Sequence, residues 1–392
     1  EAVSPVIVKE LRQAVRGRFI VAVILLFLAV QLVTMGIALL VNAVSASNIE
    51  QAAAGRPVFL TIFGILIGTC IVCIPAYTGI RLAAERSDVN VDLLFITSLE
   101  PRSIILGKLG SAMILTALIY SACVPFLAFT YFLRGVDFPS IAVLLAMGFL
   151  AVSVMVSIAI TLATIPVTRP FKVILGLGML SMGFPTIPIL IALSFQFLQG
   201  SGGGLIGSMD FWIGAGVTVA FVVAACSVLL ALATAQVTPP AANRARPVRI
   251  MLTLFWLVTG AGAGVLVWQI GRLEPVIAWM IFQLCLLTLC MVVAASERRE
   301  LGPRVTRSIP ESLGARILAF PFYSGSLSGL AWTVMMMLAT IGVVLGAGKL
   351  LGSPSGTDHL EAASWLGDAL VYISGYTMAG IALREWGILK KI

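Results

Sequence analysis

Charged residues are scarce in this sequence of 392 residues: Asp, Glu, Lys and Arg together make up 11% of it, whereas 60% of the residues are hydrophobic. No long stretch is polar enough to form the surface of a soluble domain. This composition excludes an ordinary soluble protein and predicts an all-α polytopic integral membrane protein. The apolar residues form continuous blocks and do not alternate with polar ones, which favours membrane-spanning helices over a β-barrel.

Groups that catalyse reactions or bind metals are also scarce. The single histidine, His359, lies beside Asp358 and Glu361 in an expected outer loop, 351–364. A short exposed loop does not supply the pocket and orienting groups that a catalytic base or a metal site needs. We therefore expect that the chain is not an enzyme and binds no metal.

The sequence lacks the phosphate-binding pattern GxxxxGK[ST]. Gly107-Lys108 is followed by Leu109, where a hydroxyl for Mg²⁺ would be required. We expect no ATP site and no cofactor in this chain.

Cysteines are few, and all six lie inside apolar runs, where they act as small apolar side chains: Cys70, Cys73, Cys123, Cys226, Cys285 and Cys290. The Cys70-x-x-Cys73 spacing is compatible with a redox or metal pair, but no second pair and no histidine is nearby. Structural disulfides are not expected.

Ten apolar runs are long enough to span a bilayer core, which takes roughly 20 helical residues. Nine contain no charged residue, and the last contains only Asp368 near one end. An ion-driven carrier is therefore disfavoured, because it needs ionisable groups inside the membrane. The expected spans are 19–41, 58–80, 109–133, 141–165, 173–198, 211–235, 250–269, 275–295, 323–348 and 365–383.

Lys and Arg in short loops are retained on the cytoplasmic side, so their placement predicts orientation. Of the 25 Lys and Arg residues, all fall on the inner side of these spans except Arg56, Arg134, Arg272 and Lys349. Both termini are therefore expected in the cytoplasm. The net charge of +8 is spread over several juxtamembrane segments. It indicates topology and contact with anionic membrane lipids, and no nucleic acid partner is expected.

The first residues predict a short interfacial helix, 4–17, because Ser4 is a suitable N-cap and Pro5 a suitable first helical residue. Apolar and basic side chains then fall on opposite faces: Val6, Ile7, Leu11 and Val15 against Lys9, Arg12 and Arg16. The alternative is that this segment extends the first span. No signal peptide is expected, since the apolar run after Arg18 is too long for one.

The segment 81–108 between the second and third spans is charged, although long apolar runs flank it. Residues 81–86 continue the second span beyond the membrane, and Asp88 and Asn90 are suited to a turn or an N-cap. Residues 91–96 then predict a short helix with Asp92 in its first turn, where a negative charge is favourable. This helix displays apolar side chains in a cytoplasmic loop.

Residue patterns at two places together resemble one family. The first is Pro5-Val6-Ile7-Val8-Lys9-Glu10-Leu11-Arg12. The second comprises Glu85-Arg86, Asp92-Leu93-Leu94, Thr97, Leu99, Pro101, Ile105 and Gly107-Lys108. In their order, and in their positions on six spans, these residues resemble the ABC-2 family of ABC-transporter permeases over residues 1–240.

The resemblance implies the transmembrane subunit of an ATP-driven exporter in a bacterial inner membrane, as a homodimer or paired with a related permease. A separate ATP-binding subunit would hold ATP and Mg²⁺ and dock on the segment 81–108. The residues implied in this coupling are Arg81, Glu85, Arg86, Asp92, Leu93, Leu94, Thr97 and Leu99, and those of the interfacial helix are Pro5, Lys9, Glu10, Leu11 and Arg12. The alternative is an amphipathic loop whose leucines rest on lipid.

The run 238–244, with Pro239-Pro240, predicts a boundary between a six-span unit, 1–240, and a further four-span unit, 241–392. The longest inner loop, 297–322, lies in the second unit. It is expected either to dock a partner or to form an amphipathic helix on lipid.

Small residues and prolines within the spans predict packing details. Gly64-x-x-x-Gly68, Gly260-x-x-x-Gly264 and Gly342-x-x-x-Gly346 allow close helix contacts, although such spacings also arise by chance. Pro185 and Pro188 are expected to break the fifth span. In the family such a break helps line the translocation path; a plain kink is the alternative.

Three functional hypotheses result. The first is a permease subunit of an ABC exporter. The second is a non-transporting membrane scaffold with a permease-like fold in a larger complex. The third, an ion-coupled carrier, is disfavoured by the absence of charge from the spans.

Overall fold

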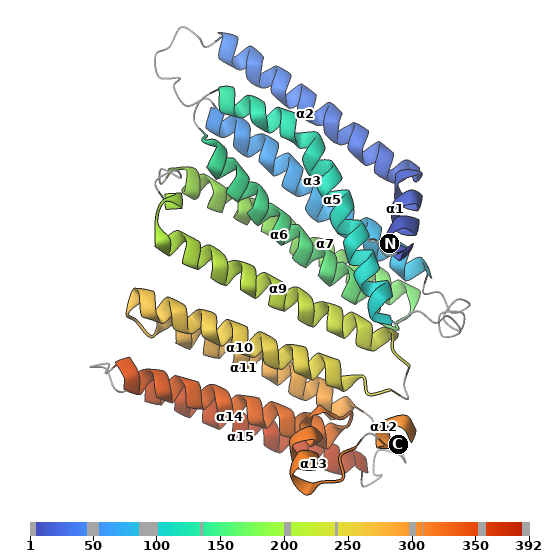
Figure 1. The fold of residues 1–392 in the computed structure, drawn as a ribbon, viewed down its shortest axis with the longest axis vertical. Coiled ribbons are helices and arrows are strands. Elements are labelled where there is room, and N and C mark those ends of the chain that lie inside the picture. The colour runs from blue at the N-terminus through green and yellow to red at the C-terminus, as the bar shows by residue number, and fades with distance from the viewer. Residues whose placement is uncertain are drawn as a thin grey trace. The chain divides into compact units, whose positions relative to one another are not determined.

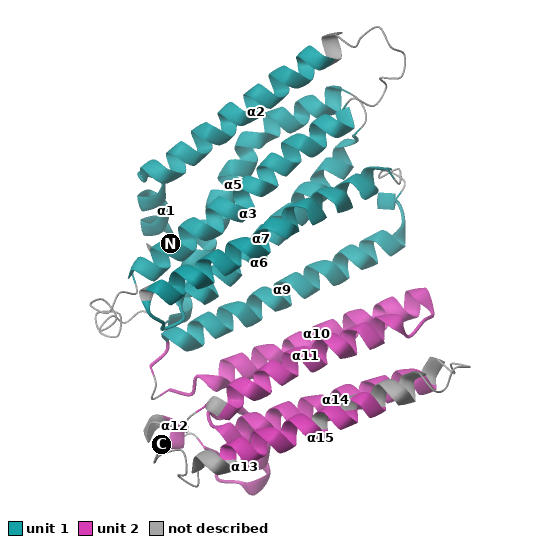
Figure 2. Ribbon diagram, turned by 180° about the vertical axis from the view of Figure 1, so that it is seen from behind, with its two compact units in different colours: residues 1–237 teal, residues 238–392 magenta. Residues whose placement is uncertain are grey.

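The structure, a computed structural model, describes residues 5–44, 55–85, 101–133, 136–199, 205–239, 242–297, 303–307, 309–351 and 358–385. Within these ranges the chain forms helices and no strand, so the all-α prediction is confirmed. Two compact units, 1–237 (unit 1) and 238–392 (unit 2), divide the chain beside Pro239 (Figure 2).

In the described residues nine helices are long and apolar enough to cross a membrane, as in a multi-pass membrane protein. They overlap the first nine expected spans. The tenth expected span, 365–383, lies within helix α15 (Asp358–Glu385), which is not among these nine. The nine are α2 (Arg18–Val44), α3 (Gly55–Glu85), α5 (Pro101–Phe132), α6 (Phe138–Ala163), α7 (Arg169–Gln199), α9 (Met209–Val237), α10 (Ala245–Ile270), α11 (Glu274–Ser296) and α14 (Ser326–Leu351).

Two helices begin seven or more residues before their expected spans. Helix α5 begins at Pro101, so residues 101–108 form its first two turns; proline suits the first turn because its missing N–H has no partner to lose there. Helix α15 begins at Asp358, so residues 358–364, expected in an outer loop, are helical. The prediction of a loop through residue 364 was wrong, because it followed hydropathy and polar helical turns can precede an apolar span.

The first segment forms its own helix, α1 (Pro5–Val15), which Figure 1 shows turned away from the line of α2. A turn at Arg16 and Gly17 separates the two helices. Gly17 fits there because a Cβ at this position would lie 3.0 Å from the Ala14 carbonyl oxygen. The alternative that this segment simply extends the first span is therefore wrong.

Helix α3 forms the centre of unit 1 and packs against α2, α5, α6 and α7. Its residues Phe59, Ile62, Leu66 and Ile74 are fully buried. Helix α9 completes the unit on α6, where the Thr161 hydroxyl donates a hydrogen bond to the Leu229 carbonyl oxygen at 2.9 Å. A polar contact of this kind helps to hold apolar helices together.

Helices α3 and α7 approach closely at glycines. A Cβ on Gly64 would lie 3.0 Å from Ile191 Cδ1, and one on Gly183 would lie 3.4 Å from Ile71 Cγ2. The Gly64 motif therefore does allow a close contact. Helix α7 continues through Pro185 and Pro188, so the predicted break in the fifth span was wrong. Apolar packing on α3 accompanies the prolines and favours a continuous helix.

Unit 2 is held together by tryptophan–threonine pairs between α10, α11 and α14. Trp256 donates to Thr340, and Trp279 to Thr259, both at 2.9 Å. Trp279 also lies 3.0 Å from where a Cβ on Gly260 would be, whereas a Cβ on Gly342 or Gly346 would meet no described atom within 4 Å. Of the two glycine motifs expected in unit 2, only the one in α10 thus makes a close contact among the described residues.

The outer parts of unit 2 are short helices and α15. Between α11 and α14 lie α12 (Pro303–Arg307), α13 (Leu313–Ala319) and a 3-10 turn, η1 (Phe320–Phe322). Helix α15 packs against α11 and α14.

Among the described glycines of unit 1, Gly148 in α6 has the least room for a side chain. A Cβ there would lie 2.4 Å from Ile67 Cδ1 and 2.9 Å from the Tyr120 hydroxyl. We expect Gly148→Val to destabilise the protein by about 1–3 kcal/mol through overpacking. Gly36→Val is the matched control, since a Cβ at Gly36 would meet nothing within 4 Å. Thermal unfolding in detergent measures both; equal midpoints would contradict this packing.

Candidate functional site

Lys108, in the second turn of α5, links α5 to α1 and to the end of α3. Its ammonium group lies 3.0 Å from a carboxylate oxygen of Glu10 in α1 and 2.7 Å from one of Glu85, the last residue of α3. The Lys108 side chain is only 4% exposed, whereas Glu10 is 13% and Glu85 44% exposed. The pair Glu85–Lys108 therefore ties together the two helices that flank residues 86–100.

Burial makes these ion pairs necessary. An ammonium group withdrawn from water is costly unless anions compensate it, and removing one partner of a buried pair is strongly destabilising. Lys108 has two carboxylates, one from each neighbouring helix. Their geometry fixes the end of α3 and helix α1 relative to α5.

Arg81 brings a second cation to the cluster. Its guanidinium donates to the Tyr77 hydroxyl at 2.7 Å and lies 5.5 Å from the centre of the Tyr77 ring. It also interacts electrostatically with Glu10 and Glu85. Two cations and two carboxylates therefore balance within this group, which we call the Lys108 cluster: Glu10, Tyr77, Arg81, Glu85 and Lys108.

Apolar contacts hold α1 against α5 beside this cluster. A Cβ on Gly110 would lie 3.0 Å from Ile7 Cδ1, so Gly110 gives Ile7 room to pack. Leu11 packs on the core and Ala14 is buried, but Val15, expected on the apolar face, is 55% exposed. One face of α1 thus packs on protein, because Ile7, Leu11 and Ala14 follow helical spacing.

The sequence-predicted site residues divide into three groups. The structure brings Glu10, Arg81 and Glu85 together in the Lys108 cluster. Pro5 and Leu11 lie in α1, where Lys9 and Arg12 are exposed and α1 is a separate helix, as predicted. The remaining coupling residues lie outside the described residues: Arg86, Asp92, Leu93, Leu94, Thr97 and Leu99.

Sequence reasoning missed the central role of Lys108 and the contribution of Tyr77. The sequence pattern predicts Lys108 at the end of a loop, although it lies inside α5. One signal was present: Glu10 and Glu85 are acidic residues beside apolar segments, where an unpaired carboxylate is costly. The nearest basic residues at those span ends were candidate partners.

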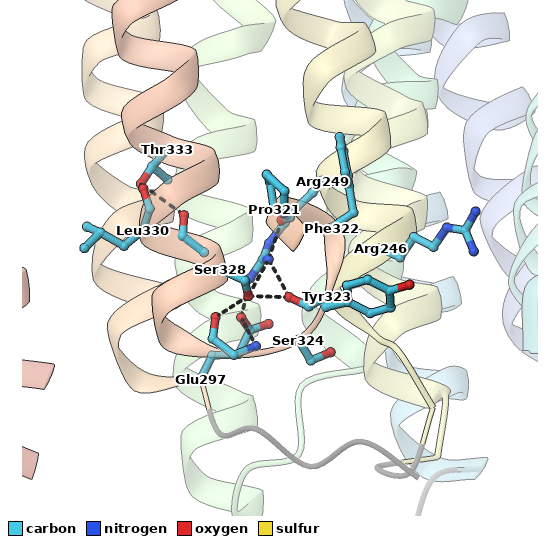
Figure 3. A network of polar contacts seen from close by, with 12 residues as sticks. Arg246, Arg249, Glu297, Pro321, Phe322, Tyr323, Ser324, Ser328, Leu330 and Thr333 are labelled. Atoms are coloured by element: carbon cyan, nitrogen blue, oxygen red, sulfur yellow. Dashed lines mark hydrogen bonds and ion pairs between the residues drawn. The ribbon is translucent and has the colours of Figure 1, made fainter. Parts of the chain in front are cut away.

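Unit 2 contains a second buried cation, Arg249 in α10 (Figure 3). Its side chain is 7% exposed and pairs with Glu297, just after α11. The guanidinium also donates to the carbonyl oxygens of Pro321 and Tyr323, both at 2.7 Å. Arg249 therefore fastens the chain that enters α14 to the start of α10.

Other polar contacts strengthen this network. Asn243 donates to the Phe322 carbonyl oxygen at 3.0 Å and accepts a hydrogen bond from Ser324 at 3.0 Å. The preceding helix α13 is different, because its Leu313 and Ile317 are 78% and 68% exposed. These exposed apolar residues lie within the loop 297–322, for which the sequence predicts contact with a partner or with lipid.

Comparisons with known proteins identify no relative: no family model, no curated protein and no solved structure matches this chain.

Replacing Lys108 by Met would leave Glu10 and Glu85 without their shared cation. We expect a loss of about 3 kcal/mol of stability, as for breaking other buried ion pairs. Lys349→Met is the control, since Lys349 is exposed in the last turn of α14. Chemical unfolding in detergent measures the difference. Addition of Glu10→Gln to the Lys108→Met variant is expected to recover part of the loss, and no recovery would argue against the pair.

Arg249→Leu is expected to release the segment before α14, because the carboxylate of Glu297 loses its cation and the carbonyl groups of Pro321 and Tyr323 lose the guanidinium that joins them to α10. We expect a loss on the order of 3 kcal/mol and faster protease cleavage within residues 309–325. The control is Arg246→Leu, an exposed position in the same helix. Cleavage at the same rate in both variants would show that Arg249 does not fasten this segment.

Proposed function

We propose that this chain is the membrane-spanning permease subunit of an ATP-driven ABC exporter, with a separate ATPase subunit as its partner. In this proposal the protein lies in a bacterial inner membrane with both termini in the cytoplasm. ATP and Mg²⁺ bind to the partner, and the permease pairs with a second copy or a related chain. The observation that carries the proposal is the Lys108 cluster, which joins α1 to both helices that flank residues 86–100.

The Lys108 cluster is placed to transmit movement of a partner bound at residues 86–100 to the helices of unit 1. Glu85 is the last residue of α3, and Lys108 lies about two turns into α5. A partner that holds Asp92, Leu93 and Leu94 would pull on α3 and α5 together, because the Glu85–Lys108 pair links them.

Lys108 extends the same connection to α1 through Glu10. Helix α1 is joined to α2 by the short turn at Arg16 and Gly17. Movement of the partner would therefore reach α1, α2, α3 and α5 as one body. ATP-driven closure of the ATPase pair would in this way change the arrangement of the spans, by rigid-body movement of packed helices.

The test begins with the intact chain, purified from its native membrane in mild detergent, with its bound proteins identified by mass spectrometry. We expect a stoichiometric ATP-binding subunit and ATPase activity. Both should be lost when Asp92 and Leu93 are replaced by Lys. The control replaces Glu311 and Leu313 by Lys, since both are exposed in unit 2.

Two results would contradict the proposal. A large assembly without an ATPase would favour the scaffold hypothesis. Gradient-driven transport by the chain alone would revive the ion-coupled carrier.

A further inference from the structure

Unit 1 contains an apolar cavity of about 350 Å³ between α3, α6 and α7. Ala159, Ala163 and Met179, which line it, are buried. Ile80 and Leu177, which also line it, are 71% and 62% exposed. The cavity thus has a closed floor and a side open to the surroundings of the helices.

The cavity lies between α3 and α7, beyond the glycine positions where the two helices are in close contact. The two helices run antiparallel: Gly64 lies against Ile191, Gly68 faces Ile187, and Gly183 lies against Ile71. The same register places the stretch 75–83 of α3 opposite 172–180 of α7, and both stretches line the cavity. Pro75 to Ala83 spans about 12 Å along the helix, at 1.5 Å per residue.

Small side chains keep this space open. Ala76, Gly79 and Ala83 line it from α3, and Gly176 lines it from α7. A Cβ on Gly176 would meet nothing within 4 Å, and one on Gly79 would lie 3.7 Å from Ala159 Cβ. The surface is smooth and apolar, which suits a hydrocarbon chain.

Lys172 gives the cavity a charge. Of the residues that line the cavity, Lys172 is the charged one. The antiparallel register of α3 and α7 places it opposite Ala83, near the C-terminal end of α3. Among the described residues no carboxylate lies within ion-pair distance of it. A cation at the end of an apolar slot about 12 Å long complements an amphiphile with a negative head and a hydrocarbon tail.

We propose that this cavity binds one anionic phospholipid, with an acyl chain between α3 and α7 and the phosphate at Lys172. The lipid belongs to the membrane leaflet on the side of the Lys108 cluster. The inference does not depend on the proposed permease function, because the cavity lies within unit 1 and needs neither an ATPase nor transport.

The test uses the full chain, delipidated in detergent and titrated with phosphatidylglycerol or phosphatidylcholine. Native mass spectrometry counts the lipids retained. The wild-type protein is expected to retain one phosphatidylglycerol in preference to phosphatidylcholine by about fivefold, the factor for one lysine near an anionic lipid. Lys172→Gln should remove this preference while a lipid is still retained. Arg246→Gln is the charge control and should keep the preference.

A second pair of variants tests the place of the acyl chain. Gly176→Leu fills the cavity and is expected to reduce retention of both lipids at least tenfold. Gly178→Leu, two residues along the same helix at a position that does not line the cavity, should behave as the wild type. Gly176→Ala and Gly176→Val give intermediate volumes, and retention should fall along the series in those variants that fold.

Three outcomes would overturn the inference. They are equal retention of the two lipids by the wild type, an unchanged preference in Lys172→Gln, and equal retention by Gly176→Leu and Gly178→Leu. ATPase association in these variants is a separate readout, so failure of the lipid site is distinguishable from failure of the permease proposal.

Discussion

A cation that leaves water needs anions or carbonyl groups around it, and this constraint organises each unit of the protein. In unit 1 Lys108 draws the end of α3 and helix α1 onto α5. In unit 2 Arg249 draws the end of α11 and the start of α14 onto α10. Apolar contacts at glycines, such as Gly64 against Ile191, determine how the helices lie along one another. The two buried cations add charged contacts near helix ends that apolar packing does not provide.

Helix α3 connects the two sites proposed for unit 1. Tyr77, Arg81 and Glu85, spaced four residues apart, face the Lys108 cluster, whereas Ala76, Gly79 and Ala83 line the cavity. The two faces belong to the same turns of the same helix. If force on residues 86–100 moves this end of α3, it also changes the width of the cavity. In the proposed permease, partner movement and lipid occupancy would then be linked by the rigidity of this one helix.

The sequence was sufficient for the helical class, for nine helices long and apolar enough to cross a membrane and for the separate helix α1, because long apolar runs and turn residues act locally. It was insufficient for features that depend on tertiary neighbours. Gly64 and Gly260 make close contacts whereas Gly342 does not, although their spacings are the same. The residue opposite each glycine decides this, and the motif does not contain it.

The candidate site likewise combines residues that local sequence pattern predicts with one that depends on tertiary neighbours. Glu10, Arg81 and Glu85 were predicted from local pattern and do meet, but their shared partner Lys108 was assigned to the end of a loop. Helix continuity through Pro185 was likewise mispredicted, because proline weakens a helix locally while packing on α3 restores it. The coupling role itself remains a proposal that rests on the resemblance and on this cluster.

The tryptophan–threonine pairs of unit 2 restrict the order in which the sequence can change during evolution. Each threonine hydroxyl accepts from an indole and donates to its own helix, as Thr259 does to Phe255 and Thr340 to Met336, both at 2.8 Å. Replacement of the tryptophan by phenylalanine leaves the threonine hydroxyl bonded to the carbonyl oxygen in its own helix. Loss of the threonine to valine first would leave a buried indole N–H with none, which is the costlier intermediate. Divergent descendants of this chain should therefore lose the indole before the hydroxyl.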